Sequence, residues 1–217
     1  MDRRQWFDQL ASTWDATFTE DVTARLRELI AGLDIRPGAR ILDIGCGTGV
    51  LAPMLLDRAG CTNAVVALDI SVEMLKRAQA KGLPVRYLLA DGEELPLRDD
   101  SFDWVICNAV FPHFPDKRSA LGEIRRVLKE AGDLLICHPN RRALVNTTHR
   151  ELGPPISADL IPSEEEMHSL LSAANLDHAS IRDVPDRYVV LASRPLQNEE
   201  RGQQEPEAPI RLSSLET

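Results

Sequence analysis

Three glycines alternate with other residues in the stretch ILDIGCGTGV, residues 41–50, directly after a short apolar run. Because glycine has no side chain, such a loop lets a ligand approach the backbone, although a tight turn between a strand and a helix needs no ligand. Gly45, Gly47 and Gly49 match neither a phosphate-binding P-loop, which requires a following Lys-Ser/Thr pair, nor the G-x-G-x-x-G spacing of dinucleotide-binding turns. Asp43 would repel a phosphate and attract an ammonium group. The stretch therefore indicates a ligand without phosphates.

Acidic residues also end the next two apolar runs. Asp69 closes VVALD, where a carboxylate can accept hydrogen bonds from both hydroxyls of a ribose; a favourable place beside a helix dipole is the alternative. Asp91 follows the third run and can accept a hydrogen bond from an exocyclic amine such as that of adenine. The backbone N–H groups of Gly92 and Glu93 can donate to a ring nitrogen. This pattern predicts a nucleoside-binding site.

Two apolar residues near Asp69 could hold a flat ring. Ile70 and Met74 could lie on either side of it, although Met74 fits the core of a helix equally well. Cys46 lies inside the glycine loop and is included in the predicted site.

The elements that would position these residues alternate between strands and helices. Continuous apolar runs predict strands, and apolar residues at helical spacing predict helices. The predicted strands are 40–45, 64–70, 84–90, 102–110, 133–138, 178–184 and 187–193, and the predicted helices are 21–33, 50–59, 71–82, 121–132 and 163–174. This order is typical of an α/β fold with a mostly parallel sheet covered on both faces. Ligands bind at the carboxyl ends of the strands in such sheets.

Composition limits the class of protein. The 217 residues suit one domain, predicted over 1–194, and the Gln-, Glu- and Pro-rich segment 195–217 is expected to be a disordered tail. A net charge of −9 disfavours broad capture of nucleic acid or of a membrane surface. The sequence has neither a signal peptide nor a membrane-spanning apolar run, so we expect a cytoplasmic protein. The four cysteines have no CxxC spacing, so we expect reduced and mostly buried thiols.

The motifs LDIGCGTG, ALDIS, ADGEELPLRDDSFDWV and ALGEIRRVLKEAGDLLI together resemble the class I S-adenosylmethionine-dependent methyltransferases. The subgroup that includes ubiquinone and menaquinone biosynthesis enzymes is the most similar, although the usual KPGG is KEAGD here. The resemblance implies a Rossmann-like, seven-stranded sheet with an antiparallel last strand, and S-adenosyl-L-methionine as cofactor. It implies that the methionine moiety lies near Asp43, Gly45, Gly47, Gly49 and Asn108, the ribose at Asp69, and the adenine at Asp91, Gly92 and Glu93.

In such enzymes the methyl acceptor is held by the N-terminal helices and by segments after the fourth and fifth strands. The aromatic residues Trp6, Phe7, Trp14 and Phe18 could cover that pocket or simply pack on the sheet edge. The sequence NAVF lacks the two prolines of the [DN]PP[YF] motif of adenine and amide N-methyltransferases. These features favour a small-molecule acceptor. The alternatives are a non-catalytic cofactor-binding module and, against the glycine spacing, an NAD-dependent oxidoreductase.

Histidines supply the candidates for a catalytic base. Methyl transfer from a sulfonium is an in-line displacement, which needs a base only when the acceptor must lose a proton. We expect His113 and His149 to face the methyl group from opposite sides of one pocket, with Asn140 or Asn146 nearby. Capping of turns is the alternative role for both histidines. His138 lies in the same segments, and a metal site formed with it is not part of the prediction.

Overall fold

The computed structural model describes residues 1–62 and 64–196. Residues 197–217, most of the predicted tail, lie outside the described residues. Within the described ranges, no helix combines the length and the apolar composition that crossing a bilayer requires.

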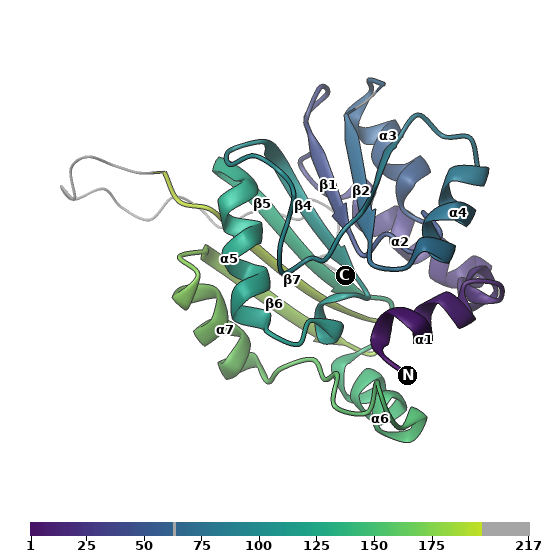
Figure 1. The fold of residues 1–217 in the computed structure, drawn as a ribbon. Helices are drawn as coiled ribbons and strands as arrows, with labels where there is room; N and C mark the ends of the chain where they lie inside the picture. Colours follow the sequence, from purple (N-terminus) through teal and green to yellow (C-terminus); the bar gives the residue numbers. More distant parts are fainter. Residues whose placement is uncertain (63, 197–217) are drawn as a thin grey trace.

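A seven-stranded sheet forms the centre of the fold, in the order β3-β2-β1-β4-β5-β7-β6 (Figure 1). The strands are β1 Ile41–Ile44, β2 Val65–Asp69, β3 Arg86–Leu89, β4 Phe102–Asn108, β5 Leu128–His138, β6 Asp177–Val184 and β7 Arg187–Ser193. β7 runs antiparallel to both of its neighbours, and the other pairs are parallel. The predicted α/β class and the antiparallel last strand are therefore confirmed.

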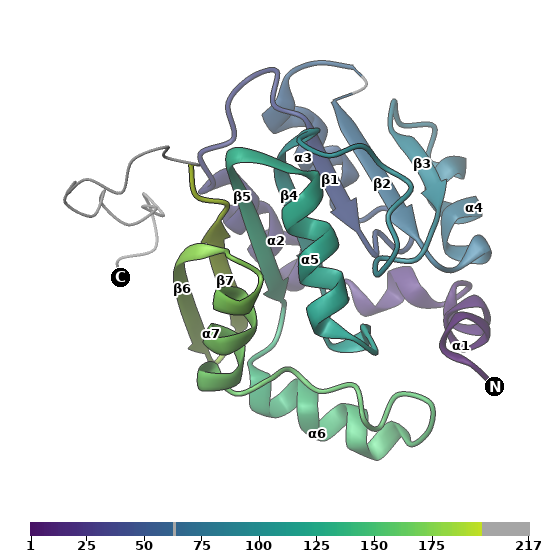
Figure 2. The ribbon, with the colours of Figure 1, turned by 60° about the vertical axis from the view of Figure 1, so that its left-hand side comes forward.

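Helices cover both faces of the sheet (Figure 2). One face carries α2 (Glu20–Ala31), α3 (Ala52–Ala59) and α4 (Val72–Ala80), and the other carries α5 (Lys117–Val127) and α7 (Glu164–Ala173). Successive side chains of a strand point to opposite faces of the sheet. The buried strands therefore contribute to an apolar core on each face.

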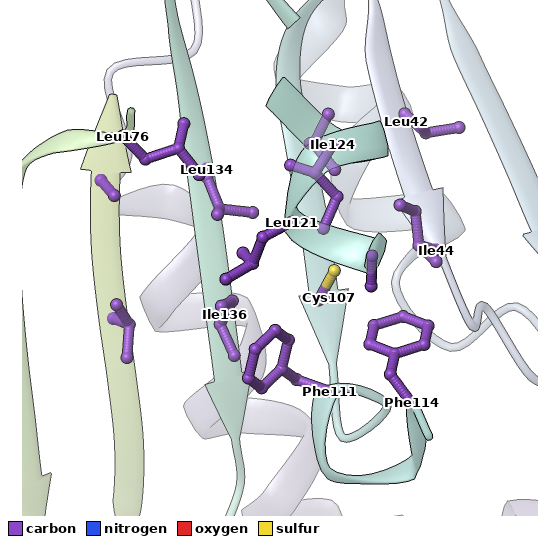
Figure 3. Packing of buried hydrophobic residues seen from close by; sticks show 14 of the residues in the cluster. Leu42, Ile44, Cys107, Phe111, Phe114, Leu121, Ile124, Leu134, Ile136 and Leu176 are labelled. Atoms are coloured by element: carbon purple, nitrogen blue, oxygen red, sulfur yellow. The ribbon is translucent and has the colours of Figure 1, made fainter. Parts of the chain in front are cut away.

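The core under α5 and α7 reaches the carboxyl edge of the sheet. Leu121 and Ile124 of α5 pack over Cys107 of β4 (Figure 3). Phe111 and Phe114 continue this cluster past the ends of β4 and β5, with their rings edge to face at 5.9 Å. The segment that follows β4 is thereby anchored in the core.

Two helices that the periodicity did not reveal lie beyond the carboxyl ends of the strands, in both views (Figures 1 and 2). They are α1 (Arg3–Leu10) and α6 (Arg142–Leu152). Two short 3₁₀ helices add to this edge: η1 (Trp14–Thr17) follows α1, and η2 (Phe111–His113) follows β4. Together they enclose the edge at which a ligand of such a sheet binds.

One predicted element is wrong in its boundary. The helix expected to stop at Gly132 ends at Val127, and β5 begins at Leu128, which pairs with Phe102 of β4. Gly132 lies inside this strand, where a Cβ atom would approach the Lys129 carbonyl oxygen to 2.9 Å. The helix predicted over 163–174 is confirmed as α7, and Ser163 and Glu166 form a capping box at its start by exchanging two hydrogen bonds.

Candidate functional site

A cavity of about 420 Å³ opens where the carboxyl ends of β1, β2 and β4 face the N-terminal segment. Its walls come from the turns after the first four strands, from η2 and from α1 and η1. Ten of the fourteen predicted site residues line it: Gly45, Cys46, Gly47, Asp69, Ile70, Met74, Asp91, Gly92, Asn108 and His113. Asp43, Gly49, Glu93 and His149 are not among the lining residues.

Packing explains why residues 45 and 47 of the loop are glycines. Gly45 has φ +67°, and a Cβ atom there would lie 2.5 Å from the Cβ of Val110. A Cβ atom on Gly47 would lie 3.1 Å from the indole nitrogen of Trp14. A Cβ atom on Gly49 would meet Ala78 and the Tyr87 hydroxyl, and the place of Gly49 beside the methionine moiety stays a prediction. The loop thus brings backbone to the cavity at Gly45 and Gly47.

Asp69 reaches the cavity from the tip of β2. It is 7% exposed, and its two carboxylate oxygens accept hydrogen bonds from the backbone N–H groups of Gly47 and Ser71, each at 2.8 Å. Burial raises its pKa, while these backbone donors act in the opposite direction. A carboxylate oxygen can accept more than one hydrogen bond, so acceptor capacity remains for a vicinal diol.

Asp43 lies below the loop, in the middle of β1. Its side chain is 2% exposed, and within the described part of the chain no donor bonds to its carboxylate. Burial, reinforced by the nearby Asp69, raises the pKa of Asp43 to about 8. A buried acid without a partner holds its proton at neutral pH, because ionising it there costs free energy that only a cation could offset.

Asp43→Asn is expected to stabilise the free protein increasingly as the pH rises. The raised pKa means that the folded chain keeps a proton which the unfolded chain loses above pH 4, so wild-type stability falls between about pH 4 and pH 8. Asparagine removes this loss, at most about 1.4 kcal/mol for each pH unit in that window. Urea unfolding at pH 5, 6.5 and 8 measures the difference between the two proteins. Parallel stability curves would show that Asp43 is ionised in the folded protein.

On the adenine side, Asp91 and Gly92 line the cavity, whereas Glu93 does not. Asp91 is exposed, lines the cavity and accepts a hydrogen bond from the backbone N–H of Glu93 at 3.0 Å. That N–H group is therefore already engaged, and the prediction that Glu93 donates to a ring nitrogen is corrected. Gly92 lines the cavity, where a Cβ atom would lie 2.5 Å from the Phe114 ring. Met74 is buried in α4 and also lines the cavity, so both of its predicted roles remain open.

The N-terminal segment is fastened over the cavity by acidic side chains. Asp8 accepts a hydrogen bond from the Ser71 hydroxyl at 2.6 Å, and Asp15 accepts one from the Thr48 hydroxyl. Both partners lie in the turns that hold the predicted cofactor residues. Sequence reasoning missed these two acids, since no local spacing links them to Ser71 or Thr48.

Aromatic residues of the same segment form one wall. Phe7, Trp14 and Phe18 line the cavity, whereas Trp6 does not line it and packs edge to face on Phe7 at 5.0 Å. The expected aromatic cover therefore consists of three of the four residues.

The predicted arrangement of the histidines is wrong. His113 lines the cavity, whereas His149 does not. His149 lies beside His113, with the two ring centroids 4.9 Å apart, and its Nδ1 donates a hydrogen bond to the Asp159 carbonyl. Asn146 is held away from the cavity, because its side chain exchanges hydrogen bonds with the Ile161 backbone. The backbone N–H of Asn140 bonds to Nδ1 of His138. α6 thus contributes a structural layer behind His113.

Asp159 is a functional candidate that the sequence did not suggest. Its carboxylate is 2.9 Å from Nδ1 of His113 and accepts hydrogen bonds from Arg3 Nε at 2.9 and 3.2 Å. Burial opposes ionisation of this acid, but the hydrogen bonds from Arg3 and His113 outweigh it and lower the pKa of Asp159 to about 2. His113 has a lowered pKa, since burial acts more strongly on it than Asp159 does.

Other reactive groups play structural parts. In the described ranges, no set of three or more His, Cys, Asp or Glu side chains is placed to hold a metal ion. All four cysteines are free, and Cys46, Cys107 and Cys137 are buried as expected, whereas Cys61 is exposed. Asn108 lines the cavity, and its side-chain oxygen is 3.5 Å from the Cys137 sulfur.

Known methyltransferases are similar to this chain in sequence. Residues 42–136 match the family model of a methyltransferase domain. A demethylmenaquinone methyltransferase of Thermus thermophilus is 39% identical over 139 residues, which are 60% of this chain and 62% of that protein. This chain therefore spans less than two thirds of that relative.

Two solved structures share the fold. A chain from the complex between the Haloferax volcanii Trm112 methyltransferase activator and a methyltransferase superposes with a TM-score of 0.74, at 23% identity, over 90% of this chain and 100% of that chain. A SAM-dependent methyltransferase from Aquifex aeolicus superposes with a TM-score of 0.67, at 24% identity, over 85% of this chain and 98% of that chain.

Proposed function

We propose that residues 42–136, which match the family model of a methyltransferase domain, form a domain of the class I S-adenosylmethionine-dependent type, and that this protein transfers the methyl group of S-adenosyl-L-methionine to a small molecule. The observation that carries the proposal is the cavity at the carboxyl edge of the sheet, with the Asp69 carboxylate on one wall and an aromatic cover opposite. The proposal also places the protein in the cytoplasm.

The residues present suit the cofactor. Asp69 offers carboxylate oxygens to ribose hydroxyls, and Asp91 offers an acceptor to an adenine amine. Asp43 provides a buried acid without a protein partner in the described residues, which would ionise beside the ammonium group of a bound cofactor. The bound cofactor supplies an activated methyl group on a sulfonium, so the protein has to orient an acceptor and exclude water.

The acceptor would lie between the aromatic wall and η2. Phe7, Trp14 and Phe18 provide an apolar surface that suits a small, largely apolar molecule. His113 would take the proton that the acceptor loses, since it borders the cavity and its lowered pKa keeps it neutral near pH 7. This base role deepens the proposal and is tested separately below.

Transfer of a radiolabelled methyl group to fractionated metabolite pools tests the proposed activity. A labelled small-molecule product that depends on the enzyme supports the proposal and identifies the acceptor. Tight binding of the cofactor with no transfer to any pool would favour a non-catalytic binding module. Binding of NAD, with no response to the methyl donor, would overturn the proposal.

Asp69→Ala is expected to weaken binding of S-adenosyl-L-homocysteine, the demethylated product, by about 5- to 150-fold. This corresponds to about 1–3 kcal/mol, the free energy of leaving buried polar partners unpaired. Calorimetry measures the dissociation constant, and thermal melting checks that the variant is folded. Asp57→Ala, at an exposed position of α3, serves as the matched control. An unchanged dissociation constant in the folded Asp69 variant would place the ribose elsewhere.

A further inference from the structure

Three segments that are far apart in the chain meet at one carboxylate. Asp159 follows α6, His113 ends η2, and Arg3 begins α1. The Asp159 side chain is 2% exposed and contacts both the imidazole and the guanidinium. Arg3 lies 156 residues away in sequence and His113 lies 46 residues away.

The protonation state of Asp159 decides which imidazole nitrogen of His113 carries the hydrogen. Asp159 has a pKa of about 2, so its carboxylate is ionised at neutral pH and can only accept hydrogen bonds. Nδ1 of His113 must therefore carry the hydrogen of their 2.9 Å contact. In a neutral imidazole, Nε2 is then the unprotonated nitrogen. Within the residues that the structure describes, Nε2 has no hydrogen-bond partner, and His113 borders the cavity.

We propose that Asp159 is the positioning residue of His113, and that Arg3 links this pair to the N-terminal helix α1. Asp159 fixes the Nδ1–H tautomer, so that the basic Nε2 is the nitrogen available to a molecule in the cavity. Because Arg3 begins α1, its contact with Asp159 forms only when the helix that covers the cavity is docked. The inference rests on the proposed function for its catalytic meaning, whereas the tautomer itself is a property of the free protein.

Several charged groups surround the pair. His149 packs on the His113 ring. Burial lowers the pKa of His138, and the nearby His149 and His113 lower it further. Lys117 of α5 and Glu93 also act on this group of side chains. Among the neighbours of His113, Asp159 raises its pKa, whereas Arg3 and His149 lower it. Removing Asp159 or Arg3 should therefore shift the titration of His113 in opposite directions.

The test is an NMR titration of the full-length protein with ¹⁵N-labelled histidine, and it needs no acceptor. His113→Gln identifies the resonances of His113. In wild type we expect the Nδ1–H tautomer and a pKa below that of a free histidine. Asp159→Asn should mix the two tautomers and lower the pKa further, because the carboxylate that favours the charged imidazole is gone. Arg3→Gln should keep the tautomer and raise the pKa.

Arg150→Gln is the matched control, since it removes an exposed arginine of α6 next to His149. It should leave the titration of His113 unchanged. The Nε2–H tautomer in wild type, or a titration that Asp159→Asn leaves unaltered, would overturn the inference. If Asp159→Asn does not fold, the upward shift in Arg3→Gln decides the question, and the absence of that shift overturns the link to α1. None of these outcomes depends on methyl transfer, so failure of the proposed function would be recognised separately by the transfer assay.

Discussion

Replacing His113 with alanine is expected to lower the turnover of methyl transfer by about 10²- to 10⁴-fold, the usual contribution of a general base. The expectation applies to an acceptor that must lose a proton. His113 borders the cavity, its Nδ1 is engaged by Asp159, and its Nε2 faces no protein partner in the described residues. Burial lowers the pKa of His113, so the base form prevails at neutral pH. It is lost only as the pH falls below the pKa of an ordinary histidine.

The measurement compares the rate of methyl transfer with the affinity for the demethylated cofactor in the same variant. Affinity should change little, because the predicted cofactor contacts come from other residues. His168→Ala is the matched control, since His168 is exposed on α7. If His113→Ala keeps more than half of the wild-type turnover, the base role is refuted. In that case the acceptor reacts without losing a proton or loses it directly to water.

Gly45→Ala is expected to destabilise the fold by about 2–5 kcal/mol. Two costs combine at this position. An alanine at φ +67° adopts the left-handed region, which costs roughly 1–2 kcal/mol for a residue with a Cβ atom. The new Cβ would also lie 2.5 Å from the Cβ of Val110, and relieving such overpacking costs about 1–3 kcal/mol. This sum is a large fraction of the stability of a typical domain.

Gly38→Ala separates the two costs. Gly38 has φ +86°, but a Cβ atom there would have no neighbour within 4 Å. Urea unfolding should therefore show a loss of only about 1–2 kcal/mol for this variant. Equal losses for the two variants would mean that Val110 moves aside freely, and the close packing of the glycine loop on the segment after β4 would then have no energetic weight.

The sequence alone determined the fold class and the edge of the sheet at which the cavity lies. Continuous apolar runs and helical spacing are local properties, so strands β1 to β5 and the helices between them could be predicted from residues close together in the chain. Asp69 and Asp91 could be singled out for the same reason, because residues at the end of a parallel strand or just beyond it lie at the carboxyl edge. Boundaries were less certain, as the early start of β5 at Leu128 shows.

Tertiary structure alone decided which residues meet at that edge. Gly49 belongs to the same motif as Gly45, yet a Cβ atom on Gly49 would meet Ala78 of α4, whereas one on Gly45 would meet Val110. Asp159 reaches His113, and Arg3 reaches Asp159, only through the way in which α1 and α6 dock beyond the strands. No periodicity encodes such a meeting, since the contact energy depends on side chains that lie 46 and 156 residues apart. The sequence therefore indicated the edge at which the cavity opens, and the docking of the two helices decided which histidine borders the cavity and which acid contacts that histidine.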